Sequence, residues 1–250
     1  MSRCRLASPS PSPSFDRCAE RYDELRPVDE SWWEVFADLV RLGSLRGARV
    51  LEIGCGTGRL AAALAEREHA RVWAVDAAPA MVERAKALGV NARVARADAL
   101  PFKRGWFEAV AMRMVAHLLD RSRAFPEAQR VLGAGGRLVI ATHDPESFER
   151  VWFAPFFPSF LELERGRFPG EETLRRELAA AGFGDVVVER RTQPRQLTRE
   201  RALDILRSRA YSTFELLPPA EYAAGVRRAE ADLPPQVDYA VHWLFATAST

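Results

Sequence analysis

The most constraining feature of the sequence is a run of alternating glycines between an apolar segment and a helical pattern. Residues 48–53 are mostly apolar, Gly54, Gly56 and Gly58 follow, and residues 59–67 have the pattern of a helix. Glycine lets the backbone turn tightly and lets a ligand approach without interference from a Cβ atom. A strand, a glycine loop and a helix in this order predict a nucleotide-type ligand site at the carboxyl end of the strand.

Short apolar segments and helical patterns alternate along the rest of the chain. Segments that fit strands lie at residues 72–75, 91–95, 107–112, 137–142, 185–190 and 237–247. Helical patterns lie at residues 15–25, 31–42, 79–88, 125–132, 171–181, 199–209 and 219–232. Such alternation indicates βαβ units with helices on both faces of a sheet. The predicted fold class is therefore α/β: a doubly wound, mostly parallel, seven-stranded Rossmann-like sheet.

Two carboxylates follow neighbouring strands of this predicted sheet. Asp76 ends the second strand, about twenty residues after Gly54, where an acidic residue accepts hydrogen bonds from ribose hydroxyls. Asp98 follows the third strand and is expected beside the same crevice, since ligands bind outside the carboxyl ends of such strands. The loop does not fit a dinucleotide fingerprint, because its sixth position is Arg59 instead of glycine, and it lacks the Gly-Lys-Ser/Thr of a Walker-type phosphate loop.

Charge and composition argue against several classes of function. The 36 basic and 34 acidic side chains give a net charge of +2, and the arginines are scattered among acidic residues, which disfavours nucleic-acid binding. No apolar run is long enough to cross a bilayer and no secretory signal pattern is present, so we expect a cytoplasmic protein without membrane contact. Cys4, Cys18 and Cys55 are too scattered for a disulfide framework or a zinc site, and no metal is predicted.

Five motifs of the chain match those of a known enzyme family. They are Glu-Ile-Gly-Cys-Gly-Thr-Gly at 52–58, Val-Asp-Ala-Ala-Pro-Ala-Met at 75–81, Asp-Ala-Leu-Pro-Phe at 98–102, Phe-Glu-Ala-Val at 107–110, and Arg-Val-Leu-Gly-Ala-Gly-Gly-Arg-Leu at 130–138. With them, the chain resembles the class I S-adenosylmethionine-dependent methyltransferases, in the small-molecule branch that includes the ubiquinone/menaquinone and trans-aconitate enzymes. The resemblance is close over residues 15–142 and loose beyond them. It departs from the family pattern at Glu108, where Asp is commoner.

The resemblance implies S-adenosylmethionine as the cofactor. It implies that residues 54–58 approach the methionine part with Glu52 nearby, that Asp76 holds the ribose, and that Tyr22 closes over the methionine part. A cofactor with a sulfonium and an ammonium but no phosphate also suits a site rich in carboxylates. The cofactor-binding residues expected in full are Tyr22, Glu52, Gly54, Cys55, Gly56, Gly58, Asp76, Ala77, Met81, Asp98, Ala99 and Arg113.

Further roles follow from the same resemblance. Ala77 and Met81 would flank the adenine, and Asp98 and Ala99 would meet its edge. Arg113, which follows the fourth strand together with two methionines, would line the reacting end. Each acidic residue also has a simpler interpretation, because Asp76 could cap the next helix and Asp98 could form a turn. Cys55 is interpreted as a small loop residue and not as a nucleophile.

The chain is expected to form a single methyltransferase domain at residues 14–250 after a flexible tail at 1–13. Its expected parts are N-terminal cap helices at 14–43, a cofactor-binding core at 44–145, a helical lid and acceptor region with one core strand at 146–235, and the last strand at 236–250. Residues 152–160 are rich in aromatic side chains and are interpreted as the core of the lid. If they face the crevice instead, the acceptor has an apolar part.

The predicted reaction is in-line transfer of the sulfonium methyl group to a small-molecule acceptor. His117 is a candidate general base, although a lone histidine is more often structural. A non-catalytic cofactor-binding protein of the same fold and a nucleic-acid or protein methyltransferase stay open as alternatives. The chain has Met-Arg-Met-Val-Ala-His at 112–117, where amino-directed nucleic-acid enzymes usually carry an Asn/Asp-Pro-Pro-aromatic motif.

Overall fold

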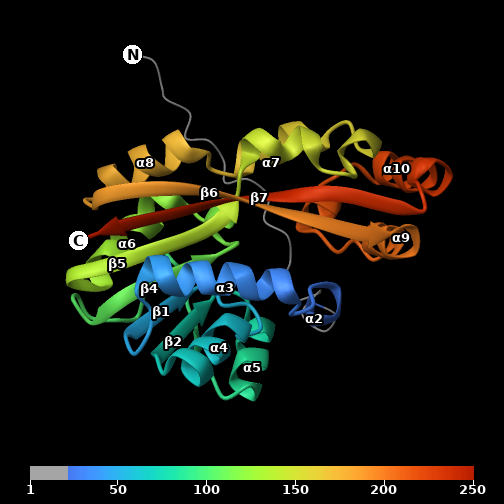
Figure 1. Ribbon diagram of the computed structural model, residues 1–250. Helices are drawn as coiled ribbons and strands as arrows, with labels where there is room; N and C mark the ends of the chain where they lie inside the picture. The colour runs from blue at the N-terminus through green and yellow to red at the C-terminus, as the bar shows by residue number, and fades with distance from the viewer. Residues whose placement is uncertain (1–21) are drawn as a thin grey trace, which may run out of the picture.

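The computed structural model describes residues 22–250, and within them seven strands form one sheet of order β3-β2-β1-β4-β5-β7-β6 (Figure 1). Strands β1 to β5 pair in parallel, and β7 runs antiparallel to both of its neighbours. The predicted seven-stranded, mostly parallel sheet is therefore confirmed. Its strands are β1 (Arg49–Ile53), β2 (Arg71–Asp76), β3 (Asn91–Val94), β4 (Phe107–Arg113), β5 (Leu132–His143), β6 (Gly184–Thr198) and β7 (Gln236–Ser249).

Helices cover both faces of the sheet. Helices α3 (Glu30–Gly43), α4 (Arg59–Glu68) and α5 (Pro79–Ala87) lie on one face, and α6 (Arg121–Val131) and α8 (Glu171–Ala180) lie on the other (Figure 1). Strand β1 is buried on both sides, as a central parallel strand requires, since Leu51 and Ile53 pack with α6 and α8 while Val50 packs with α3 and α4. Of the helix expected at 15–25, only α2 (Tyr22–Leu25) lies within the described residues, and the tail at 1–13 lies outside them.

Two boundaries in the core were predicted wrongly, the start of α6 and the start of β5. Helix α6 begins at Arg121 and contains Pro126, whereas the sequence pattern placed its start at 125, and β5 begins five residues before the expected 137. Proline inside a helix is normally disfavoured. Here Phe125 and Ala128 are fully buried against the sheet, so tertiary packing holds the helix through the proline.

The last two strands are longer than predicted and reach beyond the sheet. They pair with each other from Gly184 and Ser249 to Thr198 and Gln236, whereas β5 pairs with β7 only as far as Trp243. The distal part of β6 and β7 is therefore a two-stranded ribbon, and Figure 1 shows it extending away from the helix-covered sheet. The ribbon was missed because residues 190–196 are mostly charged or polar, which hides the alternation of a strand.

The ribbon carries a second group of helices with its own core, which we call the distal helices. They are η2 (Pro145–Arg150), η3 (Ala154–Phe156), α7 (Phe160–Arg167), α9 (Arg199–Arg207), η4 (Ser212–Glu215) and α10 (Pro219–Asp232). Phe148, Phe153, Phe157 and Phe160 are buried in one cluster with residues of α9 and α10. The aromatic segment at 152–160 thus supplies core side chains, in agreement with its interpretation.

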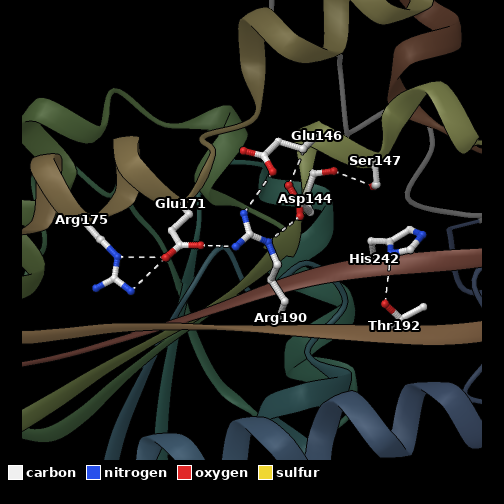
Figure 2. A network of polar contacts seen from close by, with 8 residues as sticks. All are labelled: Asp144, Glu146, Ser147, Glu171, Arg175, Arg190, Thr192 and His242. Carbon is white, nitrogen blue, oxygen red and sulfur yellow. Dashed lines mark hydrogen bonds and ion pairs between the residues drawn. The ribbon is translucent and has the colours of Figure 1, made fainter.

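An arginine network joins the distal helices to the sheet (Figure 2). Arg190 on β6 donates to Asp144 Oδ2 at 3.1 Å and to Glu146 Oε2 at 3.1 Å, and it also pairs with Glu171 at the start of α8. The Asp144 side chain is only 9% exposed. One guanidinium therefore ties the end of β5, the start of η2 and the start of α8 together.

Replacing Arg190 by Gln is expected to lower the free energy of unfolding by about 1–2 kcal/mol, because it leaves the nearly buried Asp144 carboxylate without its cation. Urea denaturation measures the effect. Arg191→Gln is the matched control, since Arg191 forms only longer pairs, at 3.3 Å, with the partly exposed Asp38 and Glu189. Its expected effect is below about 0.5 kcal/mol, and equal losses for the two variants would contradict the assignment.

Candidate active site

A cavity of about 310 Å³ opens at the carboxyl ends of β1, β2 and β4. This is the edge of a parallel sheet where ligands are expected to bind, and the volume falls within the usual range for small-molecule sites. Residues of α2, the glycine loop, the start of α5 and η1 (Ala116–Leu118) complete its walls. Of the predicted cofactor-binding residues, those that line it are Tyr22, Gly54, Gly56, Asp76, Ala77, Met81 and Arg113.

The three glycines of the loop serve different purposes. All three have positive φ values, of +73° at Gly54, +52° at Gly56 and +85° at Gly58. A Cβ atom at Gly54 would lie 2.3 Å from Val115 Cγ2, and one at Gly58 would lie 2.7 Å from Ala85 Cβ, whereas one at Gly56 would meet nothing within 4 Å. Gly54 and Gly58 are therefore required by packing, and Gly56 leaves its backbone open to a ligand in the cavity.

Asp76 fixes the loop against the end of β2. Its Oδ2 accepts a hydrogen bond from Gly56 N at 2.8 Å, and its Oδ1 accepts one from Ala78 N at 2.9 Å. An ionised carboxylate offers about four lone-pair positions, so each of its oxygens can accept more than one hydrogen bond. Asp76 thus caps the start of α5, as the simpler interpretation holds, and also borders the cavity.

Glu52 lies behind the loop and does not line the cavity wall. Its side chain is only 2% exposed, and its Oε2 has no hydrogen-bond partner in the described part of the chain. Burial raises the pKa of Glu52 to about 8, against the opposing effect of the nearby Arg113 cation. An unpartnered buried carboxyl costs free energy, and such groups gather at functional sites.

Arg113 ends β4 at the opposite side of the cavity from the residues of β2. Its guanidinium carbon lies 5.1 Å from the ring centroid of Trp32 on α3, and its Nε is buried without a hydrogen-bond partner among residues 22–250. Burial lowers its pKa, against the effects of Tyr22 and Glu52. The next residue, Met114, has a φ of +54°, a strained conformation for a residue with a side chain.

Five predicted residues are not among those that line the cavity: Glu52, Cys55, Gly58, Asp98 and Ala99. The Asp98 carboxylate pairs with Arg96 at 2.9 Å and with Arg123 at 3.2 Å, and the bond from Arg96 lowers its pKa. Ala95 and Ala97 line the cavity wall from the same segment. Burial raises the pKa of the Cys55 thiol, which agrees with its interpretation as a packed loop residue.

His117 lies on η1, and it too is absent from the cavity lining. Its ring stacks on Phe168 with 4.0 Å between centroids, and its Nδ1 is buried without a partner in the described residues. Burial, with the Arg167 cation and His143 nearby, lowers its pKa well below the ordinary value. The imidazole is therefore neutral near pH 7.

A polar clamp that the sequence did not reveal holds α2 over the cavity. The Asp23 carboxylate accepts from Thr57 Oγ1 at 2.8 Å and pairs with Arg59 Nε at 3.1 Å, and Arg59 Nη1 donates to the Arg26 carbonyl at 2.7 Å. Arg26 in turn donates to the carbonyl of Ala210 at 2.6 Å, between the distal helices α9 and η4. The sequence feature that could have indicated this clamp is Arg59, which stands where a dinucleotide fingerprint has glycine.

The stability of the ligand-free protein is expected to fall as the pH rises from about 5 to 8. Glu52 keeps its proton in the folded protein up to about pH 8, whereas it ionises near 4.5 in the unfolded chain, so the unfolded state binds fewer protons in this range. The glutamine side chain of the Glu52→Gln variant cannot ionise. The variant should therefore lose up to about 1.4 kcal/mol per pH unit of the slope of unfolding free energy against pH. Urea denaturation at pH 6 and 8 measures it, and parallel slopes for both proteins would contradict the buried neutral carboxyl.

Within residues 22–250, no helix is long and apolar enough to span a membrane, and no group of three His, Cys, Asp or Glu side chains is arranged to hold a metal ion.

Comparisons with known proteins identify the family. Residues 51–140 match the family model of a methyltransferase domain. The chain is 33% identical over 201 residues to the demethylmenaquinone methyltransferase of Thermus thermophilus, covering 68% of this chain and 90% of that one. It is 33% identical over 179 residues to the malonyl-[acyl-carrier protein] O-methyltransferase of Herminiimonas arsenicoxydans, covering 69% of this chain and 66% of that one.

A solved structure of similar fold is a SAM-dependent methyltransferase from Thermotoga maritima, described as a possible histamine N-methyltransferase. It has a TM-score of 0.57 and 21% identity, with 94% of this chain and 97% of that one covered. With the demethylmenaquinone enzyme matched over nine-tenths of its length, the chain belongs to the S-adenosylmethionine-dependent methyltransferases, and its cofactor is S-adenosylmethionine.

Proposed function

We propose that this protein transfers the methyl group of S-adenosylmethionine to a small-molecule acceptor bound beside the glycine loop. The observation that carries the proposal is the cavity itself, where the open Gly56 backbone and the Asp76 carboxylate border one carboxyl-end crevice and the Glu52 carboxyl is buried behind the loop. The demethylmenaquinone and malonyl-[acyl-carrier protein] enzymes among its relatives support a small acceptor group, either free or carried by an acyl-carrier protein, over a nucleic acid.

The residues of the cavity fit the cofactor. The Asp76 carboxylate borders the cavity and would accept from the ribose hydroxyls, and the buried Met81 with Ala77 offers an apolar surface for the adenine. Glu52 lies close to the methionine end and would accept from its ammonium group, which would lower the raised pKa of Glu52 on binding. Tyr22 on α2 would cover the same end.

The edge of the adenine has two candidate contacts. Asp98 and Ala99 remain the residues predicted from the family pattern, although the Asp98 carboxylate is engaged with Arg96 and Arg123. The lining alanines Ala95 and Ala97 favour an apolar wall there. The affinity of the Asp98→Ala variant for S-adenosylhomocysteine distinguishes the two contacts.

The bound cofactor supplies an activated methyl group, so this chain mainly has to position the acceptor and exclude water. We assign the exclusion of water to two segments, the N-terminal cap at residues 14–43 and the helical lid at 146–235, on either side of the core at 44–145. Their support is the clamp of α2, in which Asp23 and Arg59 hold the cap to the loop and Arg26 reaches the segment between α9 and η4. Movement of such segments commonly limits turnover.

A role for His117 as general base needs a path from its ring to the acceptor. The neutral imidazole has the protonation state of a base, but the ring stacks on Phe168 outside the cavity lining. His117→Asn should then lower turnover by at least a hundredfold with little change in cofactor affinity if the base is used. A smaller effect would make His117 a packing residue.

Asp76→Ala is expected to weaken binding of S-adenosylhomocysteine about tenfold, or about 1.4 kcal/mol, because the ribose hydroxyls lose their acceptor. Titration calorimetry measures it, and Asp98→Ala is the matched control. We expect unchanged affinity for the control, since the Asp98 carboxylate already pairs with two arginines. A tenfold loss in Asp98→Ala would restore its predicted adenine contact, and unchanged affinity in Asp76→Ala would remove Asp76 as the ribose ligand.

Asp23→Ala is expected to speed release of S-adenosylhomocysteine severalfold, because Thr57 and Arg59 lose the carboxylate that holds α2 over the cavity. Stopped-flow measurement of the dissociation rate tests this. Glu30→Ala, which removes an exposed acidic residue at the start of α3, is the control and should leave the rate unchanged. Equal rates for all three proteins would show that α2 does not cover the ligand.

A further inference from the structure

The Arg113 side chain is a cation in the cavity wall whose counter-ion is missing. Its Nε is buried and has no hydrogen-bond partner among residues 22–250, and no ion pair of its guanidinium lies within 4.0 Å there. Placing a charged side chain in such a site costs several kcal/mol unless a partner compensates it. The free donors of this guanidinium therefore point to an anionic ligand.

The charged neighbours of Arg113 are occupied or too far away to serve as that partner. Asp29 already accepts from Ser31 Oγ at 2.6 Å and from Trp32 N at 3.0 Å, and it pairs with Arg195 at 3.1 Å. Glu52 influences Arg113 at longer range only, and burial holds its pKa at about 8.

Tyr22 and His143 also lie near Arg113, and the His143 ring carries no negative charge. Burial, with Arg113 nearby, lowers the pKa of His143 to about 4, so this imidazole is neutral. The Trp32 ring offers its face to the guanidinium but no hydrogen-bond acceptor.

The position of Arg113 separates it from the adenosine end of the cavity. Arg113 is the last residue of β4 and pairs in register with Ala141 of β5, whereas Asp76 and Ala77 lie at the end of β2, beyond β1. The alternation of β4 places its side chain on the face of Ala109 and Ala111, which is covered by α3. The guanidinium thus lies beside Trp32 of α3, in a cavity wall that Tyr22 of α2 also lines.

The next residue, Met114, contacts two hydrophobic clusters at this position. The Met114 side chain packs against both the sheet cluster beneath α3 and the cluster of the distal helices. Its strained backbone, with a φ of +54°, sets the direction of the chain directly after Arg113. The cation therefore stands where the sheet, the N-terminal cap and the distal helices meet.

We propose that Arg113 binds a carboxylate of the methyl acceptor, so that the acceptor is an organic acid. This inference rests on the proposed function, since it names the substrate class of the same site. A guanidinium holds a carboxylate through two parallel N–H···O bonds, which fix the orientation as well as the position of the acid. The methionine part of the cofactor also carries a carboxylate, so the test has to distinguish the two sources.

The experiment uses the full chain saturated with S-adenosylhomocysteine. Acetate, succinate and benzoate are titrated as probes, each beside its uncharged amide, with binding followed by calorimetry and ligand-detected NMR. In the unaltered protein at least one acid is expected to bind at least tenfold more tightly than its amide. Arg113→Gln should abolish that preference, Arg113→Lys should retain part of it, and Arg46→Gln, at a 78% exposed site on the surface, should leave it intact.

A second titration identifies the source of the carboxylate. S-adenosylhomocysteine and 5′-methylthioadenosine share adenosine and sulfur, but only the first carries the amino-acid part. If Arg113→Gln weakens the first at least tenfold and leaves the second unchanged, Arg113 binds the cofactor and the proposal is overturned. Unchanged affinity for both, with loss of the acid preference, supports it.

Two further results would also overturn it: acids that bind the unaltered protein no better than their amides, or acids that bind Arg113→Gln equally well. Thermal unfolding of each variant establishes that it is folded before titration. Failure of the unaltered protein to bind S-adenosylhomocysteine would instead contradict the proposed function, so the two failures are distinguishable.

Discussion

The interaction on which the site depends is the pair of hydrogen bonds that the Asp76 carboxylate accepts from Gly56 N and Ala78 N. One side chain thereby joins the glycine loop after β1 to the start of the helix after β2. The positive φ angles of Gly54 and Gly58 then let Val115 and Ala85 pack against the loop, so the open backbone of Gly56 is held rigidly toward the cavity. A ligand meets a surface whose shape is fixed before binding, which reduces the entropy lost on association.

Beside this fixed surface the protein buries two ionisable side chains that form no ion pair with each other. Glu52 and Arg113 sit on neighbouring strands and each influences the pKa of the other, but no ion pair forms between them within residues 22–250. Burial without such a pair costs stability in the free protein, and it keeps Glu52 protonated near pH 7. Under the two proposals, the ammonium group of the cofactor would favour ionised Glu52 and an acidic acceptor would neutralise Arg113.

The core of the fold followed from the sequence because its strands are buried on both faces and read as short apolar runs. The distal ribbon did not, since residues such as Arg190, Gln193 and Arg195 make it resemble a loop. For the site, the glycines and Asp76 were identified from local spacing, whereas the clamp between Asp23 and Arg59 joins segments more than thirty residues apart. Asp98 shows the reverse case: its position in the chain matches the family pattern, but arginines that spacing does not reveal surround its carboxylate.

The ribbon brings residues late in the chain next to the N-terminal segment that borders the site, since the carbonyl of Ala210 accepts from Arg26 directly after α2. By continuing past the last pairing of β5 with β7, strands β6 and β7 carry α9 and α10 beyond the edge of the sheet (Figure 1). Arg190 then fixes η2 to the sheet at the point where the ribbon leaves it, as Figure 2 shows. The distal helices are thus fixed to the sheet at η2, and within residues 22–250 the carbonyl of Ala210 accepts a hydrogen bond from Arg26, directly after α2. If an acceptor enters next to Arg113 as proposed, movement of the distal helices away from α2 would have to break this hydrogen bond.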